Sequence, residues 1–154
     1  MSHYGQKMRQ LVREYRLEGG SWPASAAQMA EWALARGAWR LPPAAALRIC
    51  AKDLARAMRE ETITDPDGRK IRSKHPATVR RQGDQVTLWD DVRTAPRQHM
   101  AVSFAQRRAR IVYDCVQLKT DVDGFNSMRT DVDPIQLSLD FSRDVIEAER
   151  SRAA

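Results

Sequence analysis

The sequence predicts a mainly α-helical protein with one small β-hairpin. Three helical patterns occupy the first 61 residues, a Pro-Asp-Gly turn between two β-prone arms follows, and a longer helical pattern begins near Pro96. In these helical stretches apolar residues recur at steps of three and four, the period of a helix that buries one face. The chain is therefore expected to form three helices and a hairpin, followed by a long helix and a short terminal extended segment.

The first two helices are expected at residues 3–17 and from residue 21 to Gly37. The apolar positions of the first are Tyr4, Met8, Leu11, Val12 and Tyr15. Gly19-Gly20 should end it, because glycine adopts the left-handed cap conformation at little cost. Ser21-Trp22-Pro23 should begin the second, with Pro23 in its first turn.

The third helix is expected from Pro43 to about Glu61, and it has two distinct faces. One is apolar and is made of Leu47, Cys50, Ala51, Leu54 and Met58. The other is basic and is made of Arg48, Lys52, Arg56 and Arg59. The apolar face should pack on the rest of the domain, which leaves the basic face available for binding.

A β-hairpin should follow, with Asp65-Pro66-Asp67-Gly68 as its turn. Its second arm carries Arg69, Lys70, Arg72 and Lys74. Residues 76–83 are expected to form a loop or linker, and residues 85–89 a short strand.

The long helix is expected at residues 96–126. Its apolar seam is Met100, Phe104, Ile111, Cys115, Leu118, Val122 and Phe125, and Arg107-Arg108 interrupt it. The seam could pair with a second copy to form a homodimer, or it could pack on the first domain. The second interpretation is favoured, because a continuous coiled coil needs an apolar residue where the arginines stand.

The charge is distributed unevenly around a net value of +6. Residues 1–110 carry 21 Lys and Arg against 11 Asp and Glu, whereas residues 111–154 carry 5 against 9. This asymmetry indicates that the larger, basic part of the chain has a surface that faces a polyanion, and that the chain ends in an acidic tail.

The expected domains are 1–80, a linker or short strand at 81–95, the long helix at 96–126, and an extended peptide with an acidic tail at 127–154. The first five residues lack the apolar core of a signal peptide, which predicts a cytoplasmic protein.

Three helices followed by a hairpin, with a basic third helix and a basic second arm, resemble the winged helix-turn-helix family of DNA-binding proteins over residues 3–76. The resemblance implies that the third helix enters the major groove and that the hairpin, as the wing, contacts the backbone or the minor groove. Arg48, Lys52, Arg56 and Arg59 would then face DNA, and Arg69, Lys70, Arg72 and Lys74 would contact phosphates. The alternative is a solvated helix face and an edge strand protected by charge, or a winged helix that binds protein.

The segment Gln136-Leu137-Ser138-Leu139-Asp140-Phe141 resembles the six-residue peptide by which bacterial proteins dock on the replicative sliding clamp. The resemblance implies partner contacts from Gln136, Leu137, Leu139 and Phe141, with the apolar three on one side of an extended peptide. The alternative is an ordinary amphipathic strand that covers the core. Residues 85–89 are a looser likeness to the same kind of peptide, and a strand is the favoured interpretation there.

Little in the sequence indicates catalysis. His3, His75 and His99 lack the spacing of metal ligands, and no glycine-rich phosphate loop occurs. The Asp residues of 121–133 do not match a calcium-binding loop, and Cys50 and Cys115 are expected to be buried thiols. We therefore expect a non-enzymatic nucleic-acid-binding protein with no cofactor and no metal. A protein-protein adaptor is the alternative, and a nuclease that uses the Asp residues is a third.

Overall fold

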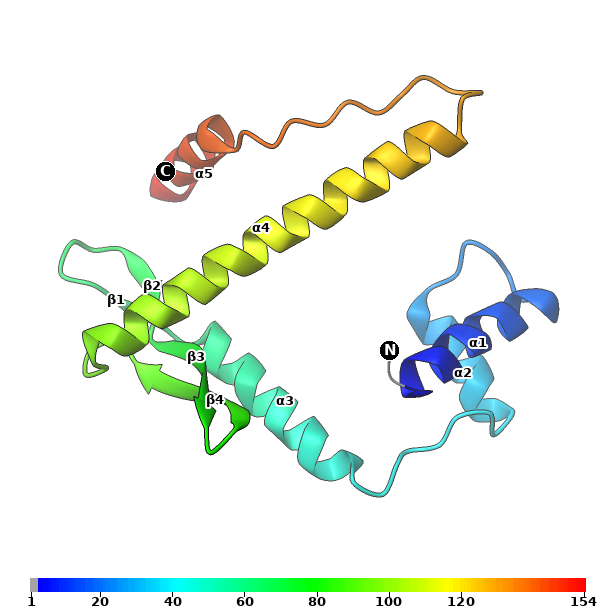
Figure 1. Cartoon of the computed structure of the whole chain (residues 1–154), viewed down its shortest axis with the longest axis horizontal. Helices are drawn as coiled ribbons and strands as arrows, with labels where there is room; N and C mark the ends of the chain where they lie inside the picture. The colour runs from blue at the N-terminus through cyan, green and yellow to red at the C-terminus, as the bar shows by residue number, and fades with distance from the viewer. Residues whose placement is uncertain (1–2) are drawn as a thin grey trace. The chain divides into compact units, whose positions relative to one another are not determined.

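The computed structural model describes residues 3–154, so Met1 and Ser2 of the N-terminal stretch lie outside the described residues. The chain is mainly helical, as predicted, and it divides into two compact units at Ala55/Arg56. The elements are α1 (His3–Leu17), α2 (Ala26–Ala35), α3 (Ala45–Glu60), β1 (Thr62–Thr64), β2 (Lys70–Arg72), β3 (Lys74–Arg81), β4 (Asp84–Asp91), α4 (Arg97–Met128) and α5 (Ser142–Ala153) (Figure 1). The boundary between the units falls inside α3.

The first unit has a small core between α1 and α2. Leu11, Tyr15 and Ala33 are buried. The rings of Tyr15 and Trp32 meet edge to face, with 5.7 Å between their centroids. This geometry is favourable for aromatic pairs because the positive ring edge meets the negative ring face. The two predicted helices are thus confirmed, and their apolar faces meet in this core.

The start of α2 corrects the prediction by several residues. The helix begins at Ala26, after Ser25, rather than at residues 21–23. The Ser25 hydroxyl accepts a hydrogen bond from the Gln28 amide at 3.1 Å, and the Gln28 side chain accepts one from the Ser25 amide at 2.8 Å. This reciprocal capping box satisfies two amide groups that the first turn leaves unpaired, which places the boundary here.

The apolar face of α3 is uncovered, which contradicts the predicted packing. Leu47 is 79% exposed and Leu54 is 58% exposed, and Cys50 and Ala51 are also exposed. The predicted burial of the Cys50 thiol is therefore wrong, and Cys115 is half-buried. Helical periodicity identifies which face is apolar, but it does not supply an element to cover that face.

The second unit contains two antiparallel hairpins. The predicted hairpin forms between β1 and β2, with Gly68 in its turn at a φ of 81°. The predicted loop at residues 76–83 is wrong, because residues 74–81 form β3 and pair with β4 from Lys74↔Asp91 to Arg81↔Asp84. The two-residue turn Gln82-Gly83 has positive φ at both positions, 50° and 85°, which suits the twist of a tight hairpin.

Helix α4 packs on β3 through polar side chains. Ser103 Oγ donates to the Pro76 carbonyl at 2.6 Å, and the amide of Gln106 exchanges two hydrogen bonds with the backbone of Thr78. His99 Nε2 lies 2.8 Å from the His75 carbonyl oxygen. Positions 99, 103 and 106 share one helix face, so α4 uses this face to satisfy backbone groups of β3. One residue of the predicted apolar seam also meets this strand, because the rings of Phe104 and His75 lie edge to face with 5.3 Å between their centroids.

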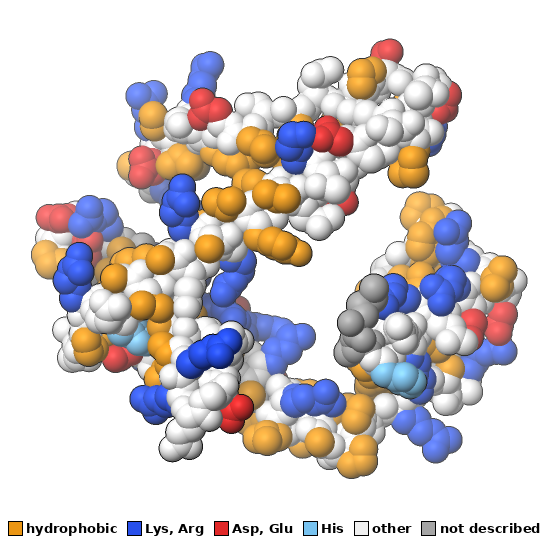
Figure 2. All heavy atoms as spheres, viewed as in Figure 1, with side chains coloured by type: hydrophobic (Ala, Val, Ile, Leu, Met, Phe, Trp, Pro, Cys, Tyr) orange, Lys and Arg blue, Asp and Glu red, His pale blue; other side chains and the backbone are white. Residues whose placement is uncertain are grey.

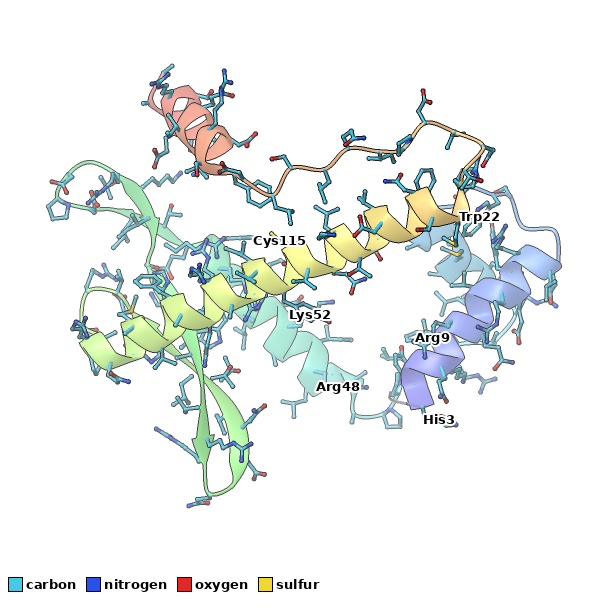
Figure 3. The ribbon with its side chains drawn as sticks, turned by 45° about the horizontal axis from the view of Figure 1, so that its top comes forward. His3, Arg9, Trp22, Arg48, Lys52 and Cys115 are labelled. Carbon is cyan, nitrogen blue, oxygen red and sulfur yellow. The ribbon has the colours of Figure 1, made fainter. Side chains whose placement is uncertain are left out.

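A segment without regular structure follows α4, and we call residues 129–141 the strap. The Asn126 amide side chain donates to the Ile135 carbonyl at 2.9 Å and accepts from the Ile135 amide at 2.8 Å. The strap therefore runs back beside α4, and Cys115 lies on the side of α4 that faces it (Figures 1 and 3). The sequence predicts an extended peptide with an acidic tail at residues 127–154, but residues 142–153 form α5, which an ion pair between Arg143 and Glu147 at 3.0 Å supports.

Candidate nucleic-acid interface

A small basic cleft lies in the second unit, where α4 faces the strands and the last turn of α3. Its volume is about 120 Å³. We call it the basic cleft, and it is lined by Arg59, Arg72, Lys74, His75, Pro76, Ser103, Gln106, Arg107 and Arg110. Figure 2 shows Lys and Arg side chains gathered between the middle of α4 and the end of α3.

Different elements hold the four arginines of the cleft in place. Arg59 lies in the last turn of α3, and its guanidinium lies 5.4 Å from the centre of the Trp89 ring. Arg72 ends β2, one residue before the fully buried Ser73. Arg107 and Arg110 belong to the part of α4 that the Gln106 hydrogen bonds tie to β3. Their backbone positions are therefore fixed by the fold.

Within the described residues, these four arginines have no carboxylate partner. Among residues 3–154, no ion pair involves Arg59, Arg72, Arg107 or Arg110. Burial lowers the pKa of the Arg107 guanidinium, and the positive charges of Arg72 and Arg110 lower it further. Like charges held this close repel one another, so an anion bound between them would relieve the repulsion.

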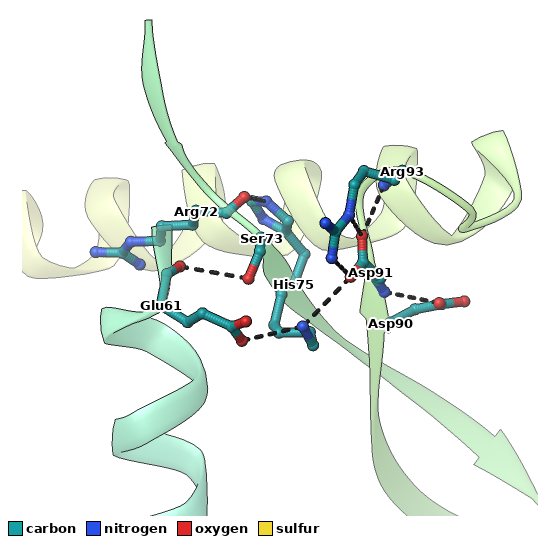
Figure 4. A network of polar contacts seen from close by, with 8 residues as sticks. Glu61, Arg72, Ser73, His75, Asp90, Asp91 and Arg93 are labelled. Atoms are coloured by element: carbon teal, nitrogen blue, oxygen red, sulfur yellow. Dashed lines mark hydrogen bonds and ion pairs between the residues drawn. The ribbon is translucent and has the colours of Figure 1, made fainter. Parts of the chain in front are cut away.

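Lys74, also predicted to contact phosphate, is neutralised by two carboxylates instead. Its Nζ lies 3.0 Å from Glu61 Oε2 and 3.3 Å from Asp91 Oδ2 (Figure 4). The hydrogen bond to Glu61 raises the pKa of Lys74, and Arg93, 2.6 Å from Asp91, holds the pKa of Asp91 well below its usual range. The network joins Glu61, which directly follows α3, to both strands of the second hairpin, so the role that geometry gives Lys74 is structural.

The other predicted wing cations differ in whether a carboxylate pairs with them. Arg69 pairs with Asp65 at 2.7 Å and with Asp67 at 2.8 Å, within the turn of the first hairpin. Lys70 is exposed, and the described part of the chain contains no ion pair to it. Arg72 is thus the wing residue that the structure brings to the basic cleft without a competing carboxylate.

The four predicted cations of α3 are divided by the unit boundary. Arg48 and Lys52 belong to the first unit, where they line a pocket of about 420 Å³ together with Tyr4, Trp39, Leu41, Pro42, Ala45 and Ile49 (Figure 3). Arg56 is exposed in the second unit, and Arg59 enters the basic cleft. The cleft therefore joins Arg59, Arg72 and Lys74, and the structure does not gather all eight predicted cations in one site.

Sequence reasoning missed Arg107 and Arg110, which supply half of the unpaired charge of the cleft. Arg107 was interpreted only as an interruption of the apolar seam. The available signal was a polar helix face, since Ser103, Gln106 and Arg110 follow one another at steps of three and four.

The predicted clamp-contacting residues all lie in the strap. Leu137, Leu139 and Phe141 are 37%, 39% and 41% exposed, so more than half of each side chain is covered. The strap is extended, as a docking peptide requires, and it lies beside α4 rather than free in solvent.

No group of three or more His, Cys, Asp or Glu side chains within residues 3–154 is arranged to hold a metal ion. Over the same residues, no helix has the length and apolarity needed to cross a membrane. Comparison with protein-family models, with curated proteins and with solved structures finds no match for this chain.

Proposed function

We propose that this chain is a non-enzymatic nucleic-acid-binding protein whose basic cleft contacts the phosphates of duplex DNA. The observation that carries the proposal is the convergence of four arginines from α3, β2 and α4 on one cleft, without a carboxylate partner among the described residues. Surface arginines that serve only solubility are commonly interspersed with acidic residues. Phosphate oxygens are suitable partners, because a guanidinium donates two parallel hydrogen bonds to them.

Salt dependence tests the proposal. Each phosphate that a cation neutralises releases counterions, and the logarithm of the affinity for B-DNA then falls with the logarithm of salt concentration by about 0.9 per contact. Fluorescence anisotropy of a labelled duplex of mixed sequence, at several salt concentrations, measures this slope. The double variant Arg72→Ala/Arg107→Ala should weaken binding and reduce the slope by about 2.

A matched control removes the same charge elsewhere. Arg150 and Arg152 lie in the last turn of α5, next to acidic residues, so Arg150→Ala/Arg152→Ala should leave the slope nearly unchanged. If both double variants lose the same affinity, the loss comes from the change in net charge and not from the basic cleft. Absence of wild-type binding at low salt would refute nucleic-acid binding itself.

The winged-helix mode is a finer proposal, in which the basic face of α3 enters the major groove. Arg48, Lys52 and Arg56 are exposed on this helix, as that mode requires. Changing all three to Ala should reduce affinity and lower the preference for one duplex sequence over another, because groove contacts read bases. If the triple variant binds every duplex as the wild type does, the groove mode is wrong.

Docking on a bacterial sliding clamp is a second proposal, and the extended strap favours it. The strap must leave α4 before Leu139 and Phe141 can enter a clamp pocket. Asn126→Ala removes both hydrogen bonds to Ile135 and should therefore strengthen co-elution with a purified clamp. Leu139→Ala/Phe141→Ala should abolish co-elution, whereas Val145→Ala/Ile146→Ala in α5 should not. Wild-type protein that never co-elutes would exclude this partner.

The alternative function, a protein-protein adaptor, is supported by uncovered apolar side chains on α4. Ile111, Val112, Tyr113 and Val116 are exposed, and Figure 2 shows hydrophobic side chains along this helix. A homodimer through α4 would cover them. Light scattering measures the mass of the chain in solution and so tests for this homodimer. A monomer at micromolar concentration would exclude the homodimer.

A further inference from the structure

We propose that the basic cleft seats a terminal phosphate, the monoester dianion at a nucleic-acid end, in preference to an internal phosphodiester. This inference rests on the proposed function, because it specifies what the same cleft recognises. Hydrogen-bonding capacity and charge lead to it, and the cleft has room for a phosphate group.

The cleft has room for a phosphate group. Its volume of about 120 Å³ is well above the roughly 10–15 Å³ that one water molecule needs. The five heavy atoms of a phosphate group fit such a space, so hydrogen bonding and charge decide which kind of phosphate suits the cleft.

The polar side chains of the cleft other than its arginines are already engaged. Ser103 Oγ donates to the Pro76 carbonyl, and the Gln106 amide uses its oxygen and its nitrogen on Thr78. His75 Nε2 lies 2.9 Å from the Arg72 carbonyl oxygen. The free groups of the cleft are consequently guanidinium donors, and a ligand that only accepts hydrogen bonds complements them.

Charge separates the two kinds of phosphate. Four cleft arginines lack a carboxylate partner within the described chain, whereas the charge of Lys74 is balanced by Glu61 and Asp91. An internal phosphodiester brings one negative charge and two non-bridging oxygens. A terminal phosphate brings a charge of about −1.5 to −2 near pH 7 and three acceptor oxygens, so it matches the surplus of donors and of charge more closely.

The test compares duplexes that differ only at one end. Two duplexes of identical sequence, with a fluorophore at the far end and either a 5′-phosphate or a 5′-hydroxyl at the near end, are titrated with the full chain at pH 7.5. We expect about tenfold tighter binding of the phosphorylated duplex, the gain from one further charge-assisted hydrogen bond. The preference should shrink at pH 5.5, where the monoester carries less charge, because its second pKa is near 6.

Variants locate the preference in the cleft. Arg107→Ala and Arg72→Ala should each remove most of it, and Arg107→Lys should keep the charge but lose part of the preference, because Lys lacks the two-pronged donor geometry. Circular dichroism identifies a variant that fails to fold, and Arg107→Lys then serves as the informative substitution. Unchanged preference in all three variants would overturn the assignment to this cleft.

The outcomes separate this inference from the proposed function. Equal binding of the two duplexes overturns the inference and leaves nucleic-acid binding intact, whereas no binding of either overturns both. A phosphoserine peptide is added as a competitor at the same concentration as the phosphorylated duplex. Competition as strong as that of unlabelled phosphorylated duplex would overturn a nucleic-acid end as the source of the phosphate.

Discussion

Gln106 is expected to hold α4 against β3, and with it two of the four cleft arginines. Its side chain accepts a hydrogen bond from the Thr78 amide at 2.8 Å and donates one to the Thr78 carbonyl at 2.7 Å. Gln106→Ala removes both bonds at once. Arg107 and Arg110 follow on the same helix, so a loosened α4 should also misplace their guanidinium groups.

The expected magnitude follows from these two bonds. A typical intramolecular hydrogen bond contributes about 1 kcal/mol net, so the pair contributes about 2 kcal/mol. Alanine restores a few tenths of a kcal/mol, because it is the better helix former. Thr78 is half-buried, which lets water reach its freed groups and limits the loss. We expect α4 to separate from β3 more easily by about 1.5–2 kcal/mol.

Amide hydrogen exchange measures this effect at the residue concerned. The Thr78 amide of Gln106→Ala should exchange about 10- to 30-fold faster than that of the wild type, which is the factor for that free energy. Gln98→Ala is the matched control, since Gln98 is an exposed glutamine near the start of the same helix. Equal Thr78 protection in the two variants would refute the view that this side chain holds the helix.

Three further substitutions and one pH series test the packing. Ser73→Leu should destabilise the chain by about 1–3 kcal/mol in urea unfolding, because Ser73 is fully buried and the added atoms have no space. Gly20→Ala should destabilise the chain by a similar amount in thermal unfolding, because the added Cβ would lie 2.5 Å from the buried Tyr15 ring. The Cβ added by Gly124→Ala, in the interior of α4, meets nothing within 4 Å, so this substitution should stabilise the chain by about 0.5–1 kcal/mol. Asp91 has a lowered pKa in the folded chain, so its stabilising contribution is present above its unfolded pKa near 4 and is lost as pH falls further. The melting temperature of Asp91→Asn should therefore fall less steeply below pH 5 than that of the wild type, and parallel curves would contradict the ion-pair assignment.

The elements that the sequence predicted best have a strong local cause. The first hairpin formed as expected because Asp65 accepts hydrogen bonds from the amides of Asp67 and Arg69 and so organises its own turn. The second hairpin was missed because Gln82-Gly83 is a weak turn pattern in sequence, and Pro76 suggested a loop. Proline is tolerated in β3 because the backbone of Pro76 faces α4, where its carbonyl accepts a hydrogen bond from Ser103. The amide that proline lacks is therefore not needed for pairing with a neighbouring strand.

The candidate site could be predicted only in part. Arg59 and Arg72 were identified from local charge patterns, because a basic helix face and a basic strand are visible within a short window. Arg107 and Arg110 come from more than 30 residues further along the chain, and they reach the cleft through the alignment of α4 on β3. That alignment depends on individual side-chain hydrogen bonds to the strand backbone, which helical periodicity does not encode.

We propose above that the unpaired arginines of the basic cleft bind nucleic-acid phosphates. Nuclear magnetic resonance of the arginine Nε–H groups, recorded while the full chain is titrated with duplex DNA, observes this contact directly. We expect the signals of Arg59, Arg72, Arg107 and Arg110 to shift together with one binding curve. The signal of Arg69, which is paired with Asp65 and Asp67, should stay nearly constant. If DNA binds and the four cleft signals do not move, the cleft is not the interface.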